Sequence, residues 1–386
     1  MLRFIAPERL EQTLLTTFDQ FAGAFGTVIQ SFELTATGNF KAVERFAKFV
    51  NVQQLSELYR AHVDVILNDD VVEFKRDNTL PKLKDDAYTR IVIPQTEGVA
   101  DELDSIKETL LWFEKLTGSE KRDNSHVPLV CFGQARKATL DIRLLNANNP
   151  DEPGSKCNET VKEILRIYHQ TAHYGGTQLV FADTYQSPPT RARHVTRATV
   201  DALTDEFGEE PTGTDAHRAE TIRFNLFTDI QRKLIEQGVP GEQISIVPVE
   251  ADKREPLFAR VRTGEVRVLL GTSERMGVGV NVQERLAAIH HLDAPNRPTD
   301  FEQRNGRIIR QGNRHAEWNL PVEVLTYGVD RTLDATAYGR LAIKQKFINQ
   351  VLKGNVSDDQ MADLNADDDF AAMSFDQMMA TLSGSQ

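Results

Sequence analysis

Residues 266–281 read VRVLLGTSERMGVGVN, and the way this stretch begins decides the expected fold. It opens with an apolar run that ends at Gly271, as expected of a strand buried on both faces of a sheet. Similar apolar runs lie on either side of it, separated by segments with helical periodicity: TQLVFAD at 177–183, ISIVPV at 244–249, LAAIHHLD at 286–293 and PVEVLTY at 321–327. Strands that alternate with helices need crossover connections, so the sequence predicts an α/β fold with a mostly parallel sheet covered by helices on both faces.

Composition and periodicity divide the chain into four expected regions. Residues 1–70 are predicted to be mainly helical, and residues 71–155 are predicted to be a mostly helical linker region. The polar run NANNPDEPGS at 146–155 marks the expected boundary, because proline, glycine and asparagine interrupt regular structure. Residues 156–352 then form the α/β lobe, ending in a long helix from about residue 332, and residues 353–386 form an acidic tail.

The linker region contains one strand-like and one helical pattern. RIVIPQ at 90–95 has the apolar, β-branched composition of a strand. Apolar residues then recur at i, i+3, i+7 and i+10, which places them on one face of a helix: Leu103, Ile106, Leu110 and Phe113.

The charge of the chain is unevenly distributed. The formal net charge is −12, which alone argues against a nucleic-acid partner, since such partners meet basic surfaces. Residues 355–386 contain seven Asp and no Lys or Arg, whereas residues 252–314 contain one Lys and eleven Arg against eight carboxylates. The arginines are therefore concentrated in the expected α/β lobe, and the acidic tail is typical of a solvated end.

Length and composition place the chain among globular proteins. Its 386 residues, 40% of them hydrophobic, are enough for two or three domains. No window approaches the roughly 18 uninterrupted apolar residues of a membrane span, and the first residues do not resemble a signal peptide. The two cysteines, Cys131 and Cys157, have no metal-ligand spacing. We expect a soluble protein without a membrane anchor, structural zinc or disulfide.

The arginine-rich segment TDFEQRNGRIIRQG at 299–312 is the strongest candidate for a functional site. Thr299 and Glu302 have the spacing of a capping box, which predicts that a helix begins there. Gln303, Arg307 and Arg310 follow at i, i+4 and i+7, so on a continuous helix they lie within about 60° of one another. Two interpretations remain open: a solvated basic helix face, or two guanidiniums that bind a phosphate.

Small residues follow the central strand at 266–271. Thr272, Ser273, Gly277, Gly279 and Asn281 offer hydroxyls and backbone N–H groups that can approach a phosphate closely. The same composition is also typical of an ordinary loop.

Several motifs that would give the chain a complete active site are absent from the sequence. No G-x-x-x-x-G-K-[ST] segment occurs, so the chain has no P-loop for the β and γ phosphates of ATP. DELD at 101–104 is better explained as a helix start, and Asp183 as a residue at a strand end. SPPT at 187–190 lacks the aromatic residue of an aminomethyltransferase loop, so a turn is the better interpretation.

Four segments, in order, resemble motifs of superfamily 2 helicases, most closely the Swi/Snf-type translocases. QLVFADT at 178–184 resembles motif IV, residues 266–281 motif V, HHLDAP at 290–295 motif Va, and QRNGRIIRQG at 303–312 motif VI. Other stretches resemble a narrower group, the phage and mobile-element proteins that join a DNA methylase to a Swi/Snf-like helicase: FDQFAGAFG, RFAKFVNVQQL, ARKATLDIRLL, LDATAYGRLAIKQKFI and MSFDQMMATLSG. The resemblance implies a RecA-like helicase C-terminal lobe at 156–352.

The resemblance also implies roles for particular residues. Arg307 and Arg310 would be arginine fingers that complete an ATP site shared with a separate lobe 1, and that lobe would hold Mg²⁺. Residues implied in cofactor binding are Gln303, Gly277, Gly279, Asn281 and Asp293, and those implied in nucleic-acid binding are Thr272, Ser273 and Arg275. Two departures from the family affect these roles: Asn313 replaces a glutamine at the end of motif VI, and Glu274 and Arg275 replace small residues in motif V.

The first residues, LRFIAPERLEQ, resemble the segment that follows motif III near the end of lobe 1, so residues 1–70 would be the helical end of that lobe. We therefore expect the C-terminal half of a DNA translocase or helicase that is inactive without lobe 1. Its implied partners are DNA, lobe 1 in cis or in trans and a DNA methylase, in the cytoplasm of a bacterial or phage-infected cell. The alternative is a non-catalytic module, derived from a helicase lobe, that docks onto DNA or protein.

Overall fold

A computed structural model describes residues 2–34, 40–64, 80–191, 221–276 and 280–332, together with residues 334, 337, 338, 341, 344 and 348. The side chains of residues 28–49, 114, 191 and 221 are not part of this description. Most of the long helix expected at 332–352 lies outside the described residues, as do the acidic tail and the two loop glycines, Gly277 and Gly279.

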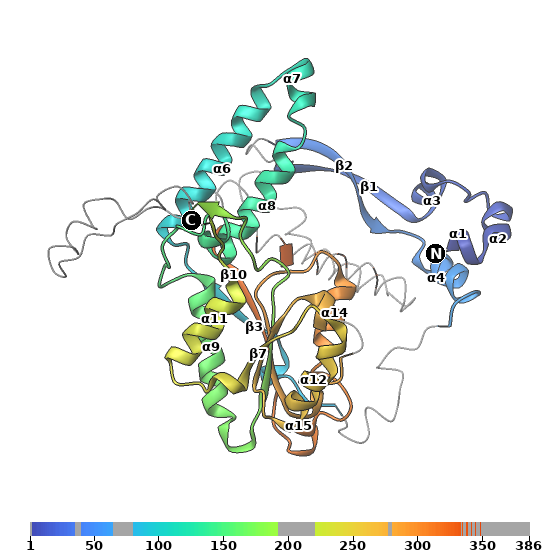
Figure 1. Ribbon diagram of the computed structural model, residues 1–386. Coiled ribbons are helices and arrows are strands. Elements are labelled where there is room, and N and C mark those ends of the chain that lie inside the picture. Colours follow the sequence, from blue (N-terminus) through green and yellow to red (C-terminus); the bar gives the residue numbers. More distant parts are fainter. Residues whose placement is uncertain are drawn as a thin grey trace.

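A six-stranded sheet forms the centre of the lobe, with strand order β3-β10-β9-β4-β8-β7 (Figure 1). Every pairing within it is parallel. The strands are β3 (Thr89–Ile93), β4 (Thr177–Phe181), β7 (Ile244–Ile246), β8 (Val268–Gly271), β9 (Leu286–His291) and β10 (Glu323–Val329). The predicted parallel sheet is confirmed.

Helices cover both faces of this sheet. In Figure 1, α9 (Lys156–Gln170) and α11 (Leu226–Glu236) lie on one side, and α12 (Arg254–Thr263) and α14 (Pro298–Asn305) lie on the other. Successive residues of a strand point to opposite faces, so Val180 belongs to the core under α9 and α11, and Leu179 belongs to the core under α12. This two-sided burial explains the uninterrupted apolar runs, and it confirms the predicted α/β class.

The sheet extends beyond the expected boundary at residue 155. Strand β3 comes from the segment 71–155, yet it pairs with β10 from Leu325 to Val329. The polar run at 146–155 connects helices within this packed unit: Glu152 accepts hydrogen bonds from Thr96 Oγ1 at 2.6 Å and from the Gly98 backbone N–H at 2.8 Å. The linker region is therefore packed against the lobe.

Three helices of the linker region form a hairpin that projects from the lobe: α6 (Glu97–Lys115), the short α7 (Gly118–Asp123) and α8 (Val127–Leu140) (Figure 1). The apolar residues of α6 pack against Cys131 and Ala135 of α8, which confirms the predicted stripe through Ile106 and Leu110.

The base of α8 is held by buried charges. Arg143 donates to Asp141 at 2.7 Å and to Asp229 of α11 at 2.9 Å. Because the hairpin is fixed at its base, it meets the sheet at a defined position.

The N-terminal region contains helices, as expected, but also an unexpected pair of strands. Its helices are α1 (Leu2–Ile5), α2 (Pro7–Gln12), α3 (Phe18–Phe25) and α4 (Val52–Arg60). Strands β1 (Gly26–Leu34) and β2 (Phe40–Phe49) form an antiparallel pair between α3 and α4. The segment RFAKFVN was expected to be helical. Its strand conformation depends on pairing with β1, which the local sequence does not show, so β2 was not predicted.

The described residues contain neither a membrane-spanning helix nor a cluster of metal-ligating side chains. No described helix is both long and apolar enough to cross a bilayer. Within the same residues, no group of three or more His, Cys, Asp or Glu side chains is placed to hold a metal ion.

A core substitution in α11 tests the packing of the sheet. Phe227 is 0% exposed, so Phe227→Ala should lower the free energy of unfolding by about 3–5 kcal/mol through lost burial and the cavity left behind. Ile235 of the same helix is 46% exposed, and Ile235→Ala should change the free energy by no more than about 0.5 kcal/mol. Urea unfolding followed by circular dichroism measures both, and equal losses would contradict the assigned burial.

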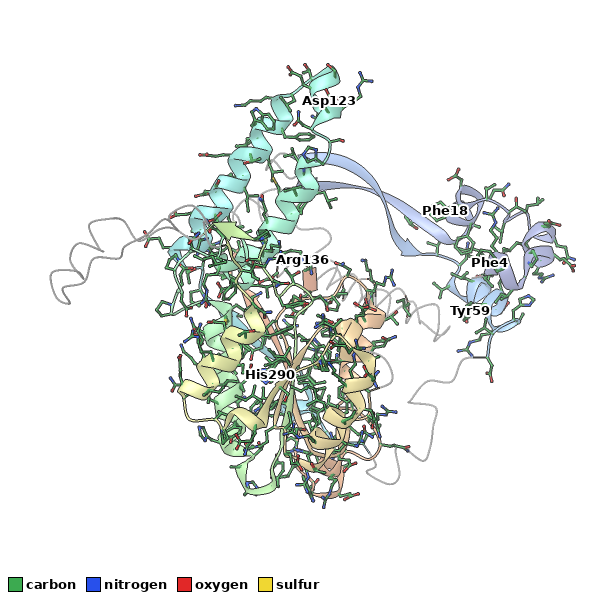
Figure 2. The ribbon with its side chains drawn as sticks, viewed as in Figure 1. Phe4, Phe18, Tyr59, Asp123, Arg136 and His290 are labelled. Atoms are coloured by element: carbon green, nitrogen blue, oxygen red, sulfur yellow. The ribbon has the colours of Figure 1, made fainter. Side chains whose placement is uncertain are left out.

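The stability of the protein should depend on pH through His290, which lies at the centre of the sheet (Figure 2). Its ring nitrogens contact Tyr327 Oη at 2.7 Å and Gln178 Oε1 at 2.9 Å. Burial and the charge of Arg166 lower the pKa of His290 to about 3. Between about pH 6.5 and that value the unfolded chain binds a proton that the folded chain excludes, so stability falls as the pH falls.

The expected contribution of His290 is about 1.4 kcal/mol of lost stability for each pH unit below about 6.5. Urea unfolding between about pH 6.5 and 4.5 measures the slope before carboxylates titrate. His290→Gln should reduce this slope by the contribution of one histidine, about 1.4 kcal/mol per pH unit. An unchanged slope would show that His290 is not buried in its neutral form.

Candidate functional site

The candidate residues gather where three adjacent strands end. Asp183 follows β4, Thr272 and Ser273 follow β8, and Asp293 follows β9, and these strands are neighbours in the order β9-β4-β8. In parallel α/β sheets, ligands bind beyond the carboxyl ends of the strands. The topology therefore brings Asp183, Ser273 and Asp293 to the edge of the sheet where a site is expected.

A buried arginine from α14 joins these three strand ends. Arg304 is 0% exposed. Its guanidinium donates to Asp183 Oδ2 at 2.8 Å, to Asp293 Oδ1 at 3.2 Å and to Ser273 Oγ at 2.7 Å. It also donates to the Asp293 carbonyl oxygen at 3.0 Å and lies over the ring of Phe181. One side chain thus links the segments that follow β4, β8 and β9.

Arg304, Asp183, Ser273 and Asp293 form a strand-end cluster, in which the two carboxylates also accept hydrogen bonds from backbone N–H groups. Asp183 accepts from the Ser273 N–H at 2.7 Å and from the Ser273 hydroxyl at 3.0 Å. Asp293 in turn accepts from the Asp183 N–H at 2.7 Å. Because its N–H and hydroxyl are both engaged within the protein, Ser273 does not present them to an external phosphate in this conformation.

His291 extends the cluster toward the surface. Arg304 Nη1 donates to His291 Nδ1 at 3.3 Å, so the ring carries its proton on Nε2, which donates to Asn305 Oδ1 at 2.7 Å. Burial and the charge of Arg304 lower the pKa of His291 well below its usual value. Asn305 Nδ2 then donates to Tyr88 Oη at 3.3 Å. His291 is therefore a neutral link between Arg304 and the end of α14.

The arginine-rich segment differs from its sequence interpretation at both ends. Helix α14 begins at Pro298, with Arg297 as N-cap and no side-chain capping bond, so the capping box predicted for Thr299 and Glu302 is wrong. Proline at the first helical position has its φ angle already set, which favours this start. The helix also stops at Asn305, so Arg307 and Arg310 lie beyond it and do not share a helix face with Gln303.

Arg307 and Arg310 are nevertheless close in space. Arg307 is half-buried, and its Nη1 donates to the Val280 carbonyl oxygen at 2.7 Å. Burial and the positive charge of Arg310 lower the pKa of Arg307. Arg310 and Gln303 are exposed. The two guanidiniums therefore lie near each other just beyond α14.

The loop after β8 reaches the arginine pair through Val280. Asn281 is exposed, and its carbonyl oxygen accepts from Arg262 Nη1 at 2.9 Å. Asn281 thus lies next to the residue that contacts Arg307. Gly277 and Gly279, predicted for the same loop, lie outside the described residues.

Arg275 and Thr272 lie on another part of this edge. Arg275 donates to Tyr185 Oη at 3.0 Å and to the Val247 carbonyl oxygen at 3.4 Å. Thr272 is buried, and its Oγ1 accepts from the Arg275 N–H at 3.3 Å. The loops after β4, β7 and β8 are therefore packed together around the Arg275 side chain.

The described residues that the sequence predicted fall into three groups, and Arg304 was missed. Asp293 and Ser273 belong to the buried strand-end cluster, and Thr272 and Arg275 are packed together on another part of the edge. The third group lies nearer the surface: Gln303, Arg307, Arg310 and Asn281. Helical spacing does not mark Arg304, because α14 ends at Asn305 and the next buried apolar residue, Ile308, lies beyond the helix.

Removing Arg304 tests the strand-end cluster. Arg304→Met leaves Asp183 and the buried Asp293 without their shared cation, which should lower the free energy of unfolding by about 3–5 kcal/mol. Arg310→Met removes an exposed arginine six residues away and should change it by no more than about 0.5 kcal/mol. Chemical denaturation of both variants makes the comparison, and a similar stability for the two would rule out a structural role for Arg304.

Solved structures similar to this chain include parts of ATPases. The C-terminal domain of a Sulfolobus solfataricus SWI2/SNF2 ATPase is 14% identical, with a TM-score of 0.42, over 76% of this chain and 96% of that one. The S. solfataricus SWI2/SNF2 ATPase core in complex with dsDNA is 15% identical, with a TM-score of 0.44, over 85% of this chain and 55% of that one. The C-terminal part of the Fun30 ATPase domain is 11% identical, with a TM-score of 0.41, over 75% of this chain and 96% of that one.

Sequence comparison gives one family. The helicase conserved C-terminal domain matches residues 216–312, a range that includes β7, β8, β9 and α14. A comparison with curated proteins found no match. The matched range carries Ser273, Asp293 and Arg304 of the strand-end cluster as well as Arg307 and Arg310. Residues 216–312 of this chain are therefore similar to the helicase conserved C-terminal domain.

Proposed function

We propose that this chain is the C-terminal half of a DNA-dependent ATPase of the superfamily 2 helicase type, in which Arg307 and Arg310 complete the ATP site. The observation that carries the proposal is the position of these two arginines, close together in the segment that follows α14, the helix that carries Arg304 beside the strand ends. The matched helicase C-terminal domain ends directly after them, at residue 312.

The charges near Arg307 support binding of a phosphate group. The positive charge of Arg310 contributes to lowering the pKa of the half-buried Arg307, so the two guanidiniums lie near each other. Planar guanidiniums bind phosphate oxygens through two parallel hydrogen bonds, and a γ-phosphate beside this pair would meet both positive charges. In phosphoryl transfer, such arginines stabilise the charge that develops in the transition state.

The residues of this chain fit the phosphate of ATP better than they fit Mg²⁺. The carboxylates nearest the strand ends, Asp183 and Asp293, are both bonded to Arg304. The sequence contains no P-loop. We therefore assign the P-loop and the Mg²⁺ ligands to a separate lobe 1, in cis or in trans. When bound, ATP supplies the phosphoanhydride bond that is hydrolysed.

DNA is the proposed second ligand. Residues 252–314 carry an excess of positive charge within an acidic chain, as expected of a surface that meets a phosphate backbone. Thr272 and Arg275 are the proposed phosphate contacts. Ser273 can join them only if its bonds to Asp183 open, because both of its donors are occupied. Asp293 is proposed to couple the DNA and ATP sites through Arg304, which it contacts directly.

A narrower role follows from the sequence resemblance alone. We assign the complete motor to phage or mobile-element DNA modification or anti-restriction, in the cytoplasm, together with a DNA methylase. The stretches that carry this resemblance include ARKATLDIRLL, which runs from Ala135 in α8 to Leu145 at the base of the hairpin.

The test is ATP hydrolysis by this chain mixed with a P-loop lobe of the same type, with and without duplex DNA. DNA-stimulated hydrolysis is expected only from the mixture. Arg307→Ala or Arg310→Ala should lower kcat by about 10³ to 10⁵, the range for loss of an arginine finger. Arg314→Ala, which removes a partly exposed arginine stacked on Trp318, is the matched control and should keep the wild-type rate.

Hydrolysis that is unaffected by Arg307→Ala would contradict this proposal. The alternative function, a non-catalytic docking module, predicts a different pattern. The chain alone would bind DNA in a salt-dependent way, ATP would not change that binding, and the mixture would show no DNA-stimulated hydrolysis.

A further inference from the structure

The loop between β9 and α14, residues 292–297, leads directly into the arginine-rich segment. It is held by side chains from distant parts of the chain. On the side of the sheet, Asp293 is bonded to Arg304. Lys156, a buried residue of α9, donates to the Leu292 carbonyl oxygen at 3.2 Å. Lys344 donates to the Asn296 carbonyl oxygen at 3.2 Å.

A further contact comes from the projecting helical hairpin. Arg136 lies near the base of α8 (Figure 2). Its Nη1 donates to Asn296 Oδ1 and its Nη2 donates to the Ala294 carbonyl oxygen, both at 3.1 Å. The two nitrogens of one planar guanidinium therefore bind two different groups of the loop, and this fixes the direction of the contact as well as its distance.

The base of the hairpin is attached to the lobe by further hydrogen bonds. Glu152 binds the start of α6 through Thr96 and Gly98. The end of α8 leads into Asp141, which is paired with the buried Arg143. Arg136 therefore extends from a helix whose base is fixed in the lobe, so a displacement of the hairpin would be passed to the loop.

The start of α14 depends on where this loop lies. The N–H groups of Asp300 and Phe301 donate to the Arg297 carbonyl oxygen, and no side chain caps the helix. Pro295 and Pro298 restrict the backbone on both sides of Asn296 and Arg297, so the loop has few ways to absorb a shift locally.

We propose that Arg136 is a positioning residue that connects the helical hairpin to the loop at 292–297 and thereby sets the start of α14. Through α14 it fixes Arg304 in the strand-end cluster, and it fixes the direction in which the chain leaves the helix toward Arg307. The link between hairpin and loop stands on contacts within this chain. Its effect on ATP hydrolysis rests on the proposed function.

Hydrogen exchange of the full chain tests the link without any ligand. Arg136→Ala should speed exchange of the Asp300 and Phe301 amides about tenfold, because two hydrogen bonds that hold the loop are lost. Arg136→Lys should restore part of the protection, since an ammonium keeps the charge but cannot reproduce the planar pair of donors. Lys137→Ala removes the neighbouring cation of the same helix and should leave these amides unchanged.

Two results would overturn the link. One is wild-type exchange at Asp300 and Phe301 in Arg136→Ala. The other is an equal acceleration throughout the chain, which would show a general loss of stability. Asn296→Ala removes only the side-chain acceptor, and it should accelerate exchange less than Arg136→Ala does if the Ala294 carbonyl also matters.

ATP hydrolysis in the mixture with a P-loop lobe tests the consequence for the site. Arg136→Ala should lower kcat severalfold and leave KM for ATP nearly unchanged, because the arginines are misplaced in the transition state while binding through lobe 1 remains. A rise in KM alone, or wild-type kinetics, would contradict a positioning role. If the wild-type mixture hydrolyses no ATP, the proposed function fails, whereas the exchange result still decides the link.

Discussion

The structure of the strand ends depends on the buried guanidinium of Arg304. A charge removed from water is costly unless neighbouring groups compensate it, and here Asp183, Asp293 and Ser273 do so from three adjacent strands. The consequence reaches α14, since the helix that carries Arg304 cannot move without breaking these bonds. Arg307, three residues later, has a different environment: its Nη1 donates to the Val280 carbonyl oxygen, and burial and Arg310 lower its pKa.

Much of the fold could be predicted because a parallel sheet buried on both faces leaves uninterrupted apolar runs. Strands β4, β8, β9 and β10 were found in this way. The local sequence could not show which strands pair with one another. The segment around Ile91 was recognised as strand-like, but nothing near it shows that it pairs with β10 and extends the lobe. Strand β2 was missed for the same reason, since its partner β1 decides its conformation.

The sequence predicted the part of the sheet where the candidate site lies, but it did not predict the contacts within the site. Asp183 was expected at a strand end and lies there. Helical spacing was extended through Gly306, so Arg307 and Arg310 were placed on a helix face that ends before them. Arg304 was not predicted as a site residue, because an arginine in a charged segment is expected to be exposed to solvent. Only the folded structure shows that two carboxylates, Asp183 and Asp293, surround it. Contacts such as Arg136 with Asn296 join residues 160 apart and leave no sequence pattern.

A double-mutant cycle between Arg304 and Asp293 measures the central interaction most directly. Arg304→Met, Asp293→Asn and the double variant would be compared by equilibrium unfolding. If the buried pair holds the strand ends together, the double variant should be more stable than the sum of the single losses predicts, with a coupling of about 1–3 kcal/mol. Additive losses would show that the two side chains contribute independently and that the strand ends are held in another way.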